Sequence, residues 1–171
     1  MTIITVSKTE SGVFLNAGDV TCLAAIGRNG MTPEGDKTEG DGMTPIGVWP
    51  IRCLYYRTDR INLPNCGVTA IPITDAMGWC DDPDHEAYNT IIHLPFSASH
   101  EVMMRADSAY DIVITLGYND DPPEAGRGSA IFFHLLHEDK SFTEGCVAIP
   151  RDEMLSILPM IKNDSVMVIQ R

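Results

Sequence analysis

The sequence predicts a mainly β domain, and two observations support this fold class. Short apolar runs rich in β-branched residues recur along the chain, and turn-forming residues separate them. Only two segments have a pattern typical of helices, so helices are expected to be a minor part of the fold. The predicted strands are residues 3–6, 20–26, 112–116, 130–133, 147–149 and 165–169.

The two predicted helices are short. Residues 99–105 are expected to form the first helix and residues 150–161 the second. The second begins with Pro150, because a missing N–H costs little in the first helical turn, and two carboxylates follow where they favour the helix dipole. Pro159 is expected to end or bend this helix, because proline removes a backbone donor.

A glycine-rich segment, residues 29–47, is predicted to be a long loop. It contains five glycines, two prolines and several charges, a composition typical of turns rather than of a buried element. Thr44-Pro45 is expected to form the turn that enters the next strand. The charged side chains of this segment are expected to be solvated; they are Asp36, Lys37, Glu39 and Asp41.

Length and composition limit the possible classes of protein. The chain has 171 residues, of which 44% are hydrophobic, so it is long enough for one well-packed domain, residues 1–171. The net charge of −12, with only 12 Lys and Arg residues, argues against a nucleic-acid partner, because phosphate binding needs clustered positive charge. These features do not specify an oligomeric state.

A cytoplasmic location is expected from the same sequence. The first residues lack the basic start, apolar run and cleavage site of a secretory signal. No later stretch approaches the ~20 apolar residues of a membrane span, so no membrane partner is expected. The five cysteines have no short paired spacing, which suits reduced thiols better than a disulfide framework.

The segment from His134 to Ile149, HLLHEDKSFTEGCVAI, contains the parts of a cysteine nucleophile with a histidine base. The strand predicted at residues 130–133 delivers His134, and Cys146 immediately precedes the next predicted strand. Two adjacent strand ends would bring these side chains together. A thiol reacts as its thiolate, and a nearby imidazole can lower the thiol pKa and carry the proton.

Two parts of the chain together resemble a known family. The first is Gly40-Asp41-Gly42-Met43-Thr44-Pro45-Ile46-Gly47-Val48-Trp49, and the second is His134 followed by Thr143-Glu144-Gly145-Cys146-Val147. In this order they resemble the L,D-transpeptidase (YkuD) catalytic domain, whose members have a glycine-rich segment leading to Thr-Pro-x-Gly and, later, a His and a Ser or Thr-x-Gly-Cys motif. The similarity spans nearly the whole chain and suits a compact single-domain branch.

The resemblance implies two curved mixed sheets, arranged as a β-sandwich or barrel with about two short helices. It also implies a cysteine that attacks the carbonyl after an L-residue, in an L,D-linkage of peptidoglycan stem peptides, without a cofactor. Cys146 would form a thioester, while His134 takes the thiol proton and returns one to the leaving amine. The backbone N–H of Cys146, presented by the turn at Gly145, would stabilise the oxyanion.

Three features depart from the family pattern. Glu144 stands where members commonly have His, and Ala148 stands where many have Arg. Glu144 is expected either to orient His134 or to contact the ammonium group of a diamino-acid side chain. Cys146 follows His134 by only 12 positions, so a smaller lid and a differently shaped cleft are expected. The substrate carboxylate is assigned to Arg151, Arg127 or Arg57, among which the sequence does not choose.

Further candidates for substrate binding come from a polar stretch, GWCDDPDHEAYN, at residues 78–89. Its side chains either line the cleft, where they bind charged or amide groups, or stabilise a turn. The predicted substrate-binding residues are Thr143, Glu144, Trp79, Asp82, Tyr88, Asn89 and Arg151.

Hydrolysis is favoured over transfer, because a cytoplasmic enzyme meets only soluble wall fragments. The predicted function is therefore an L,D-carboxypeptidase that releases the terminal D-alanine of a tetrapeptide. The same acyl-enzyme accepts an amine, so an L,D-transpeptidase is the alternative. Two other classes remain: a zinc site built on His134, His137 and Cys146, which falls short of the usual set of about four ligands, and a noncatalytic domain that binds wall peptides.

Overall fold

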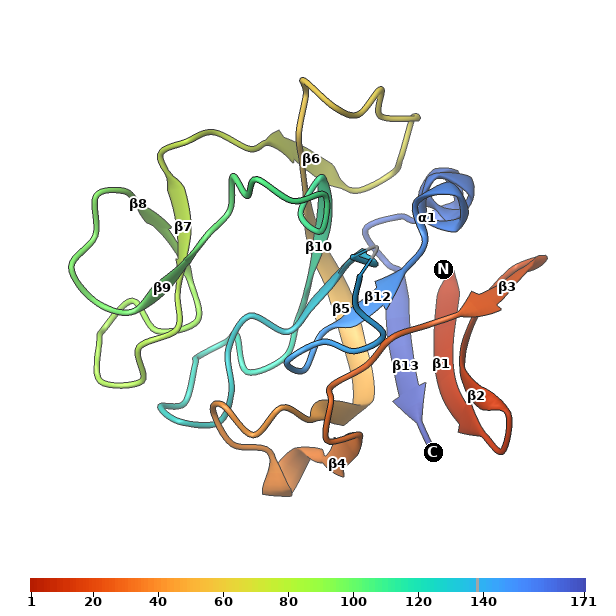
Figure 1. Cartoon of the computed structure of the whole chain (residues 1–171), viewed down its shortest axis with the longest axis horizontal. Helices are drawn as coiled ribbons and strands as arrows, with labels where there is room; N and C mark the ends of the chain where they lie inside the picture. The colour runs from red at the N-terminus through yellow and green to blue at the C-terminus, as the bar shows by residue number, and fades with distance from the viewer. Residues whose placement is uncertain (138) are drawn as a thin grey trace.

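The computed structural model describes residues 1–137 and 139–171, and a curved sheet of ten strands forms most of it (Figure 1). The strand order is β12-β11-β10-β5-β13-β1-β2-β3, and β4 and β6 also pair with β5. These strands are β1 (Ile3–Thr9), β2 (Gly12–Ala17), β3 (Val20–Leu23), β4 (Met31–Pro33), β5 (Thr44–Tyr56), β6 (Thr69–Pro72), β10 (Ile112–Leu116), β11 (Phe132–Leu135), β12 (Val147–Ile149) and β13 (Val166–Gln170).

A second, smaller sheet contains three strands in the order β8-β7-β9. Figure 1 shows it on the side of the molecule opposite β1, β2 and β3. Among the residues that the structure describes, helical structure is confined to one short α-helix and two 3₁₀ turns. These elements are β7 (Met77–Cys80), β8 (Ile91–His93), β9 (His100–Val102), α1 (Arg151–Ile157), η1 (Glu34–Asp36) and η2 (Leu158–Met160).

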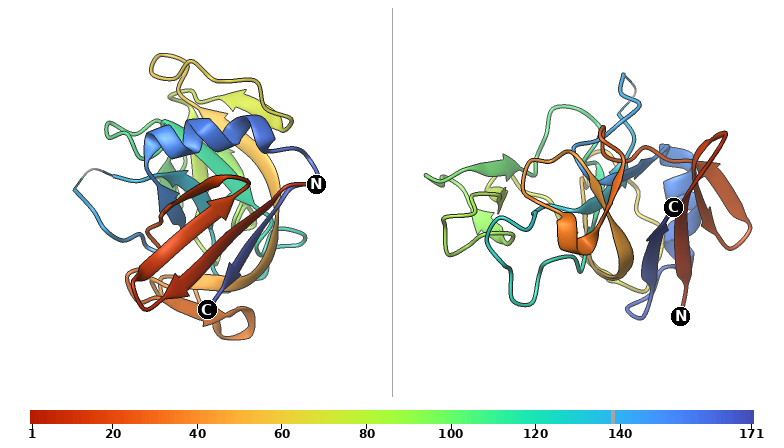
Figure 2. Two further views of the ribbon diagram at one scale, coloured as in Figure 1. Left: turned by 90° about the vertical axis from the view of Figure 1, so that its right-hand side faces the viewer. Right: turned by 90° about the horizontal axis from the view of Figure 1, so that it is seen from below.

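Strand β5 connects the two halves of the large sheet. Its first half pairs antiparallel with β13, where Val166 lies opposite Pro50. Its second half pairs antiparallel with β10, where Ile114 lies opposite Leu54, and the register shifts just beyond this pair. Strand twist and such register shifts bend a sheet. The long strand therefore curves, and the sheet wraps around its own core (Figure 2).

The two faces of β11 and β12 serve different cores, because successive strand residues point to opposite sides. Phe133 and Val147 pack with α1 in the larger hydrophobic cluster. Phe132 and Cys146 belong to a second cluster, which includes Met103 next to the small sheet. The second face is therefore the one that carries Cys146.

The predicted fold class is confirmed: the protein is mainly β, with one nearly closed curved sheet and a small second sheet. The helix predicted at residues 150–161 is confirmed as α1 followed by η2. Pro159 lies within η2, where the α-helix has already given way to the tighter 3₁₀ form. Among residues 1–137 and 139–171, no helix has the length and apolar composition needed to span a bilayer.

The helix predicted at residues 99–105 is wrong. His100–Val102 is strand β9, and it pairs antiparallel with β7 so that Trp79 lies opposite Glu101. The apolar run that suggests a helical face is Val102-Met103-Met104, and Met103 is fully buried in the second cluster. Tertiary pairing with β7 thus overrides a weak local helical preference.

The prediction that residues 29–47 form a solvated loop is also wrong in part. This segment contains β4, η1 and the start of β5, and β4 pairs parallel with β5. The Lys37 side chain is 3% exposed and forms an ion pair with Asp41 at 2.8 Å. Asp41 also accepts hydrogen bonds from the backbone N–H groups of Thr38 and Met43. Internal pairing of its charges allows the segment to be buried.

Candidate active site

Cys146 lies at the end of the turn that enters β12, with its thiol buried. The Sγ atom donates a hydrogen bond to the carbonyl of Ala130 at 3.1 Å and accepts one from the Phe132 N–H at 3.4 Å. Burial raises the pKa of the Cys146 thiol to about 12, and the negative charge of Glu101 adds to this shift. The resting cysteine is therefore a neutral thiol at pH 7.

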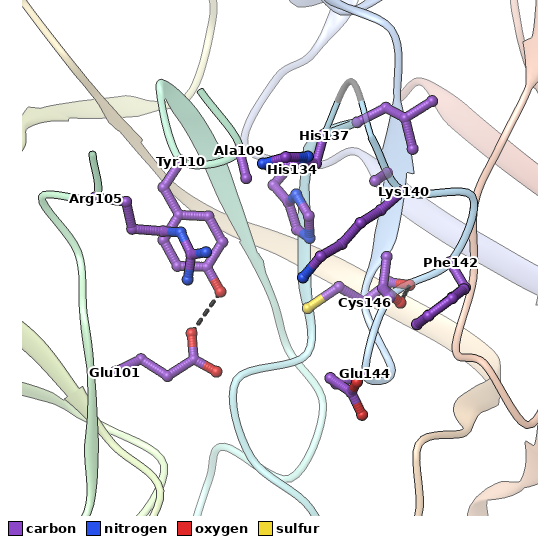
Figure 3. Close-up of a pocket in the computed structure, with 13 residues that line it drawn as sticks. Glu101, Arg105, Ala109, Tyr110, His134, His137, Lys140, Phe142, Glu144 and Cys146 are labelled. Carbon is purple, nitrogen blue, oxygen red and sulfur yellow. Dashed lines mark hydrogen bonds between the residues drawn. The ribbon is translucent and has the colours of Figure 1, made fainter. Parts of the chain in front are cut away.

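His134 lies on β11, directly beside this cysteine. The two strands run parallel with His134 opposite Ala148, so His134 and Cys146 are on the same face of the sheet. The Nδ1 atom lies 2.8 Å from the carbonyl oxygen of Leu135. A carbonyl only accepts, so Nδ1 carries the proton and Nε2 keeps its lone pair. Figure 3 shows the ring directed toward the side chain of Cys146.

The environment of His134 keeps its imidazole neutral. Burial lowers the pKa of His134 to about 4, while the hydrogen bond to Leu135 acts in the opposite direction. The ring also packs edge-on against Tyr110, with 5.3 Å between the ring centroids. A neutral imidazole beside a neutral thiol has the protonation states of a general base with its nucleophile before attack.

The hydroxyl group of Thr143 holds the turn formed by residues 143–146. Thr143 Oγ1 donates to the Cys146 carbonyl at 2.7 Å and accepts from the Gly145 N–H at 3.1 Å. Gly145 has φ +146°, and a Cβ at this position would lie 3.0 Å from the carbonyl oxygen of Met43. Glycine is therefore required both by the backbone angle and by the close approach of another segment.

The Thr-Pro-x-Gly segment is part of the same structure. Thr44 is fully buried, and its hydroxyl donates to the Gly145 carbonyl at 2.8 Å. The same hydroxyl accepts from the Gly27 N–H at 2.8 Å. Thr44 thus links β5 to the turn that presents Cys146, rather than forming only a turn into the next strand.

A pocket of about 150 Å³ opens above Cys146 and His134. Besides His134, its wall includes the basic side chains of Arg105, His137 and Lys140 and the carboxylates of Glu101 and Glu144 (Figure 3). Arg105 is held by Asp107 at 2.6 Å and stacks on the Tyr110 ring, with its Cζ atom 5.0 Å from the ring centroid. This ion pair lowers the pKa of Asp107 to about 2.

The structure brings together Cys146, His134, Gly145, Thr143 and Glu144, but Glu144 has another partner. Its carboxylate accepts a hydrogen bond from Arg28 Nη1 at 2.6 Å, and both side chains are largely exposed. No hydrogen bond joins Glu144 to His134, whose Nδ1 atom lies 2.8 Å from the carbonyl oxygen of Leu135. The Glu144 carboxylate therefore does not orient the base in this structure.

Three other predicted substrate-binding residues support the site from behind, and a fourth, Asp82, stabilises a separate turn. Asn89, in the left-handed region at φ 56°, accepts hydrogen bonds from the Ala130 N–H and from the indole of Trp79. Tyr88 accepts from the Gly128 N–H at 3.0 Å. Asp82 caps a turn by accepting from the Asp84 N–H at 3.0 Å. None of the four lines the pocket above Cys146; the first three hold the backbone around Ala130.

The arginines proposed for the substrate carboxylate lie elsewhere in the structure. Arg151 donates to the Arg60 carbonyl and lies 3.7 Å from Asp111. Arg57 pairs with Asp59, and Arg127 donates to the carbonyls of Glu34 and Gly35. Arg105 and Lys140 line the pocket instead. Arg105 is not evident as a site residue from the sequence, because the pattern of residues 99–105 suggests a helix rather than the strand β9 that leads to the pocket.

The zinc alternative depends on His137, and this side chain is directed to another partner. His137 Nε2 lies 3.9 Å from Asp107, whereas His134 Nδ1 is bonded to a carbonyl. Across residues 1–137 and 139–171, no three His, Cys, Asp or Glu side chains are grouped as metal ligands.

The fold places a buried cysteine and a neutral histidine side by side at the adjacent parallel strands β11 and β12. The family model of the L,D-transpeptidase catalytic domain (YkuD) matches residues 1–169. The chain therefore belongs to the L,D-transpeptidase family, whose enzymes act on the peptides of peptidoglycan. A comparison with curated proteins found no match.

Proposed function

We propose that the protein is an L,D-carboxypeptidase that removes the terminal D-amino acid from a peptidoglycan tetrapeptide. One observation carries this choice: the pocket above Cys146 is small, at about 150 Å³, and Arg105 and Lys140 line it together with the carboxylates of Glu101 and Glu144. A leaving D-alanine carries a free carboxylate, which cationic side chains bind through charge-assisted hydrogen bonds. A pocket of this size suits the leaving D-alanine and, after its departure, the water molecule that hydrolyses the acyl-enzyme.

The proposed reaction follows from the neutral thiol of Cys146 and the neutral imidazole of His134. His134 Nε2 takes the proton from Cys146 as the sulfur attacks the carbonyl of the L-centre, and the backbone N–H of Cys146 stabilises the oxyanion. That N–H lies just outside the β11–β12 ladder, which begins at Val147. His134 then protonates the leaving amine, leaving a thioester on Cys146. Water, deprotonated by His134, attacks the thioester and restores the thiol.

Transfer to an amine is the second candidate function, and the family to which the chain belongs favours it. Incubating the purified protein with a disaccharide-tetrapeptide, with and without an added D-amino acid, separates the two by mass spectrometry. Tripeptide plus free D-alanine in both reactions supports hydrolysis. An exchanged tetrapeptide that accumulates in place of tripeptide would overturn the carboxypeptidase proposal in favour of transpeptidation.

A cytoplasmic location is also part of the proposal, because soluble tetrapeptide fragments would be the substrates there. Fractionation of cells, followed by detection of the protein with an antibody, tests this location. Recovery of the protein outside the cytoplasmic membrane would contradict it.

A further inference from the structure

Glu101 lies where two hollows meet beside Cys146. One is the pocket that contains Arg105, and the other is bounded by residues 129–131, just before β11. Three residues line both hollows: Glu101, Glu144 and Cys146. The two hollows are therefore lobes of one cleft, and an acyl group on Cys146 would lie where they join.

Glu101 is the carboxylate at this junction that has no ion pair. Glu144 is paired with Arg28. None of the basic side chains that the structure describes forms an ion pair with Glu101. Burial raises the pKa of Glu101, and the negative charge of Asp81 adds to this shift. A carboxylate with a raised pKa is more basic than an exposed one, so it attracts a hydrogen-bond donor more strongly.

One oxygen of Glu101 is held and the other is free. Oε2 accepts a hydrogen bond from the Tyr110 hydroxyl, whereas none of the described residues donates to Oε1. Among these residues, Asp81 Oδ1 is the one partnerless side-chain atom that is sealed from solvent, so Glu101 Oε1 opens onto the cleft. Figure 3 shows this oxygen on the side of the carboxylate that faces Cys146 and Glu144. An acceptor in such a position is satisfied by water.

Tyr110 fixes Glu101 and His134 with respect to each other. Its hydroxyl holds Glu101 Oε2, and its ring packs edge-on against His134 with 5.3 Å between the ring centroids. Both side chains line the pocket above Cys146. Two acceptors, Glu101 Oε1 and His134 Nε2, are thus available beside the sulfur. A water molecule has two hydrogens, one for each of them.

We propose that Glu101 Oε1 binds the water molecule that hydrolyses the thioester on Cys146. The proposal rests on the proposed function, because it concerns the second half of that reaction. Glu101 accepts one hydrogen of the water, and His134 Nε2 takes the other as a proton, so a lone pair of the water is directed at the acyl carbon.

The atoms of this step balance without a further reactant. The water oxygen bonds to the acyl carbon, and the carbon–sulfur bond then breaks with its electron pair on sulfur. The proton held by His134 passes to the sulfur and restores the Cys146 thiol. The hydrogen that Glu101 accepts stays on the new carboxylic acid, so Glu101 ends the step unchanged.

A water-binding role differs from an effect of charge alone. Beyond the effect of burial, the negative charge of Glu101 raises the pKa of the Cys146 thiol. Removal of that charge alone would make the sulfur a better nucleophile and a better leaving group. Glu101→Gln also removes the acceptor, because the Tyr110 hydroxyl then holds the amide oxygen and the NH₂ group faces the water. Slower hydrolysis of the thioester is therefore expected only if Glu101 binds the water.

The test is a single-turnover reaction on a disaccharide-tetrapeptide with enzyme in excess. Release of D-alanine reports formation of the thioester, and release of tripeptide reports its hydrolysis; both are followed by quenched-flow mass spectrometry. In Glu101→Gln we expect D-alanine release no slower than in wild type, which also shows that the variant is folded. Tripeptide release should be about 10- to 100-fold slower, because a charge-assisted hydrogen bond to the water is lost. The acyl-enzyme should accumulate as a mass increase on Cys146.

Two further variants define the effect. Tyr110→Phe keeps the ring against His134 but removes the hydroxyl that holds Glu101, so tripeptide release should slow less than in Glu101→Gln. Glu10→Gln, in the exposed β1–β2 turn, is the matched surface control and should behave like wild type.

Three results would count against these proposals, and they are distinguishable. Tripeptide release as fast in Glu101→Gln as in Glu10→Gln would overturn the role of Glu101 and leave the carboxypeptidase assignment intact. Equal slowing of D-alanine and tripeptide release would show that Glu101 acts before the thioester forms, which also overturns that role. Absence of D-alanine from the wild-type reaction would instead contradict the proposed function.

Discussion

The hydroxyl of Thr44 joins the carbonyl of Gly145 at 2.8 Å, across 101 positions of the sequence. The same hydroxyl accepts the N–H of Gly27, so one buried oxygen connects three segments next to Cys146. The two halves of the motif are thus one structural unit, in which β5 fixes the turn that presents Cys146.

Replacing Thr44 with Val should leave a buried donor and a buried acceptor unpaired. The expected loss is about 1–3 kcal/mol of unfolding free energy, with lower turnover because the Cys146 turn loses its support. Urea denaturation followed by tryptophan fluorescence measures the first effect. Thr44→Ser keeps the hydroxyl and serves as the control; a Val variant as stable as this control would show that Thr44 does not support the turn.

Gly145→Ala should reduce both stability and activity. The residue has φ +146°, and the added Cβ would lie 3.0 Å from the Met43 carbonyl, so strain of about 1–3 kcal/mol is expected. The strain also displaces the Cys146 N–H, which lowers kcat. Gly35→Ala is the matched control, because a Cβ there meets nothing within 4 Å. Equal thermal stability and kcat in the two variants would contradict this assignment.

The depressed pKa of His134 predicts how stability changes in acid. The imidazole titrates near its ordinary value of 6.5 when unfolded, and at about 4 when folded. The unfolded chain therefore gains the proton first, and stability falls as the pH drops from 6.5 to about 4. The contribution is about 3 kcal/mol. In His134→Gln the difference in unfolding free energy between pH 7 and pH 4 should shrink by this amount; an identical difference would contradict a buried neutral imidazole.

The same pKa predicts the acidic limit of catalysis. A base that stays neutral down to about pH 4 keeps kcat/KM nearly constant between pH 7 and pH 5, because the acidic limb reports the free enzyme's base. A profile of kcat/KM against pH on a tetrapeptide measures this limb. A midpoint near 6.5 would show that His134 is more solvated than the structure indicates.

Glu101→Gln should make Cys146 more reactive toward iodoacetamide. The Glu101 charge helps to raise the thiol pKa, so its removal lowers that pKa and increases the thiolate fraction at pH 8. Alkylation of Cys146 is followed by peptide mass spectrometry, with Glu10→Gln as the surface control. Slower alkylation in Glu101→Gln than in that control would show that Glu101 does not disfavour the thiolate.

Much of the site was predictable, because its signals are local. Cys146, Gly145 and Thr143 lie in one motif, and an apolar run identifies the strand that carries His134. The pairing of strands that lie far apart in the sequence was not predictable from such local signals. Glu101 and Arg105 reach the site only because β9 pairs with β7, and nothing in the sequence near His100 specifies that partner.

The partners of charged side chains were the least predictable part of the site. Lys37 and Asp41 look solvated in a glycine-rich segment, yet their mutual ion pair allows Lys37 to be buried. Glu144 looks available to His134 or to substrate, yet Arg28 binds it from 116 positions away. A sequence gives the charge of a side chain but not the counter-ion that the fold places beside it.

The central claim is that Cys146 cleaves the L,D-bond of a tetrapeptide by hydrolysis. The most direct measurement is the rate of D-alanine release from a disaccharide-tetrapeptide, in parallel for wild type and Cys146→Ala. We predict stoichiometric D-alanine and tripeptide from wild type, and a rate at least about 10³-fold lower in the variant, because loss of an essential nucleophile removes the covalent route. Equal rates in the two proteins would contradict the account.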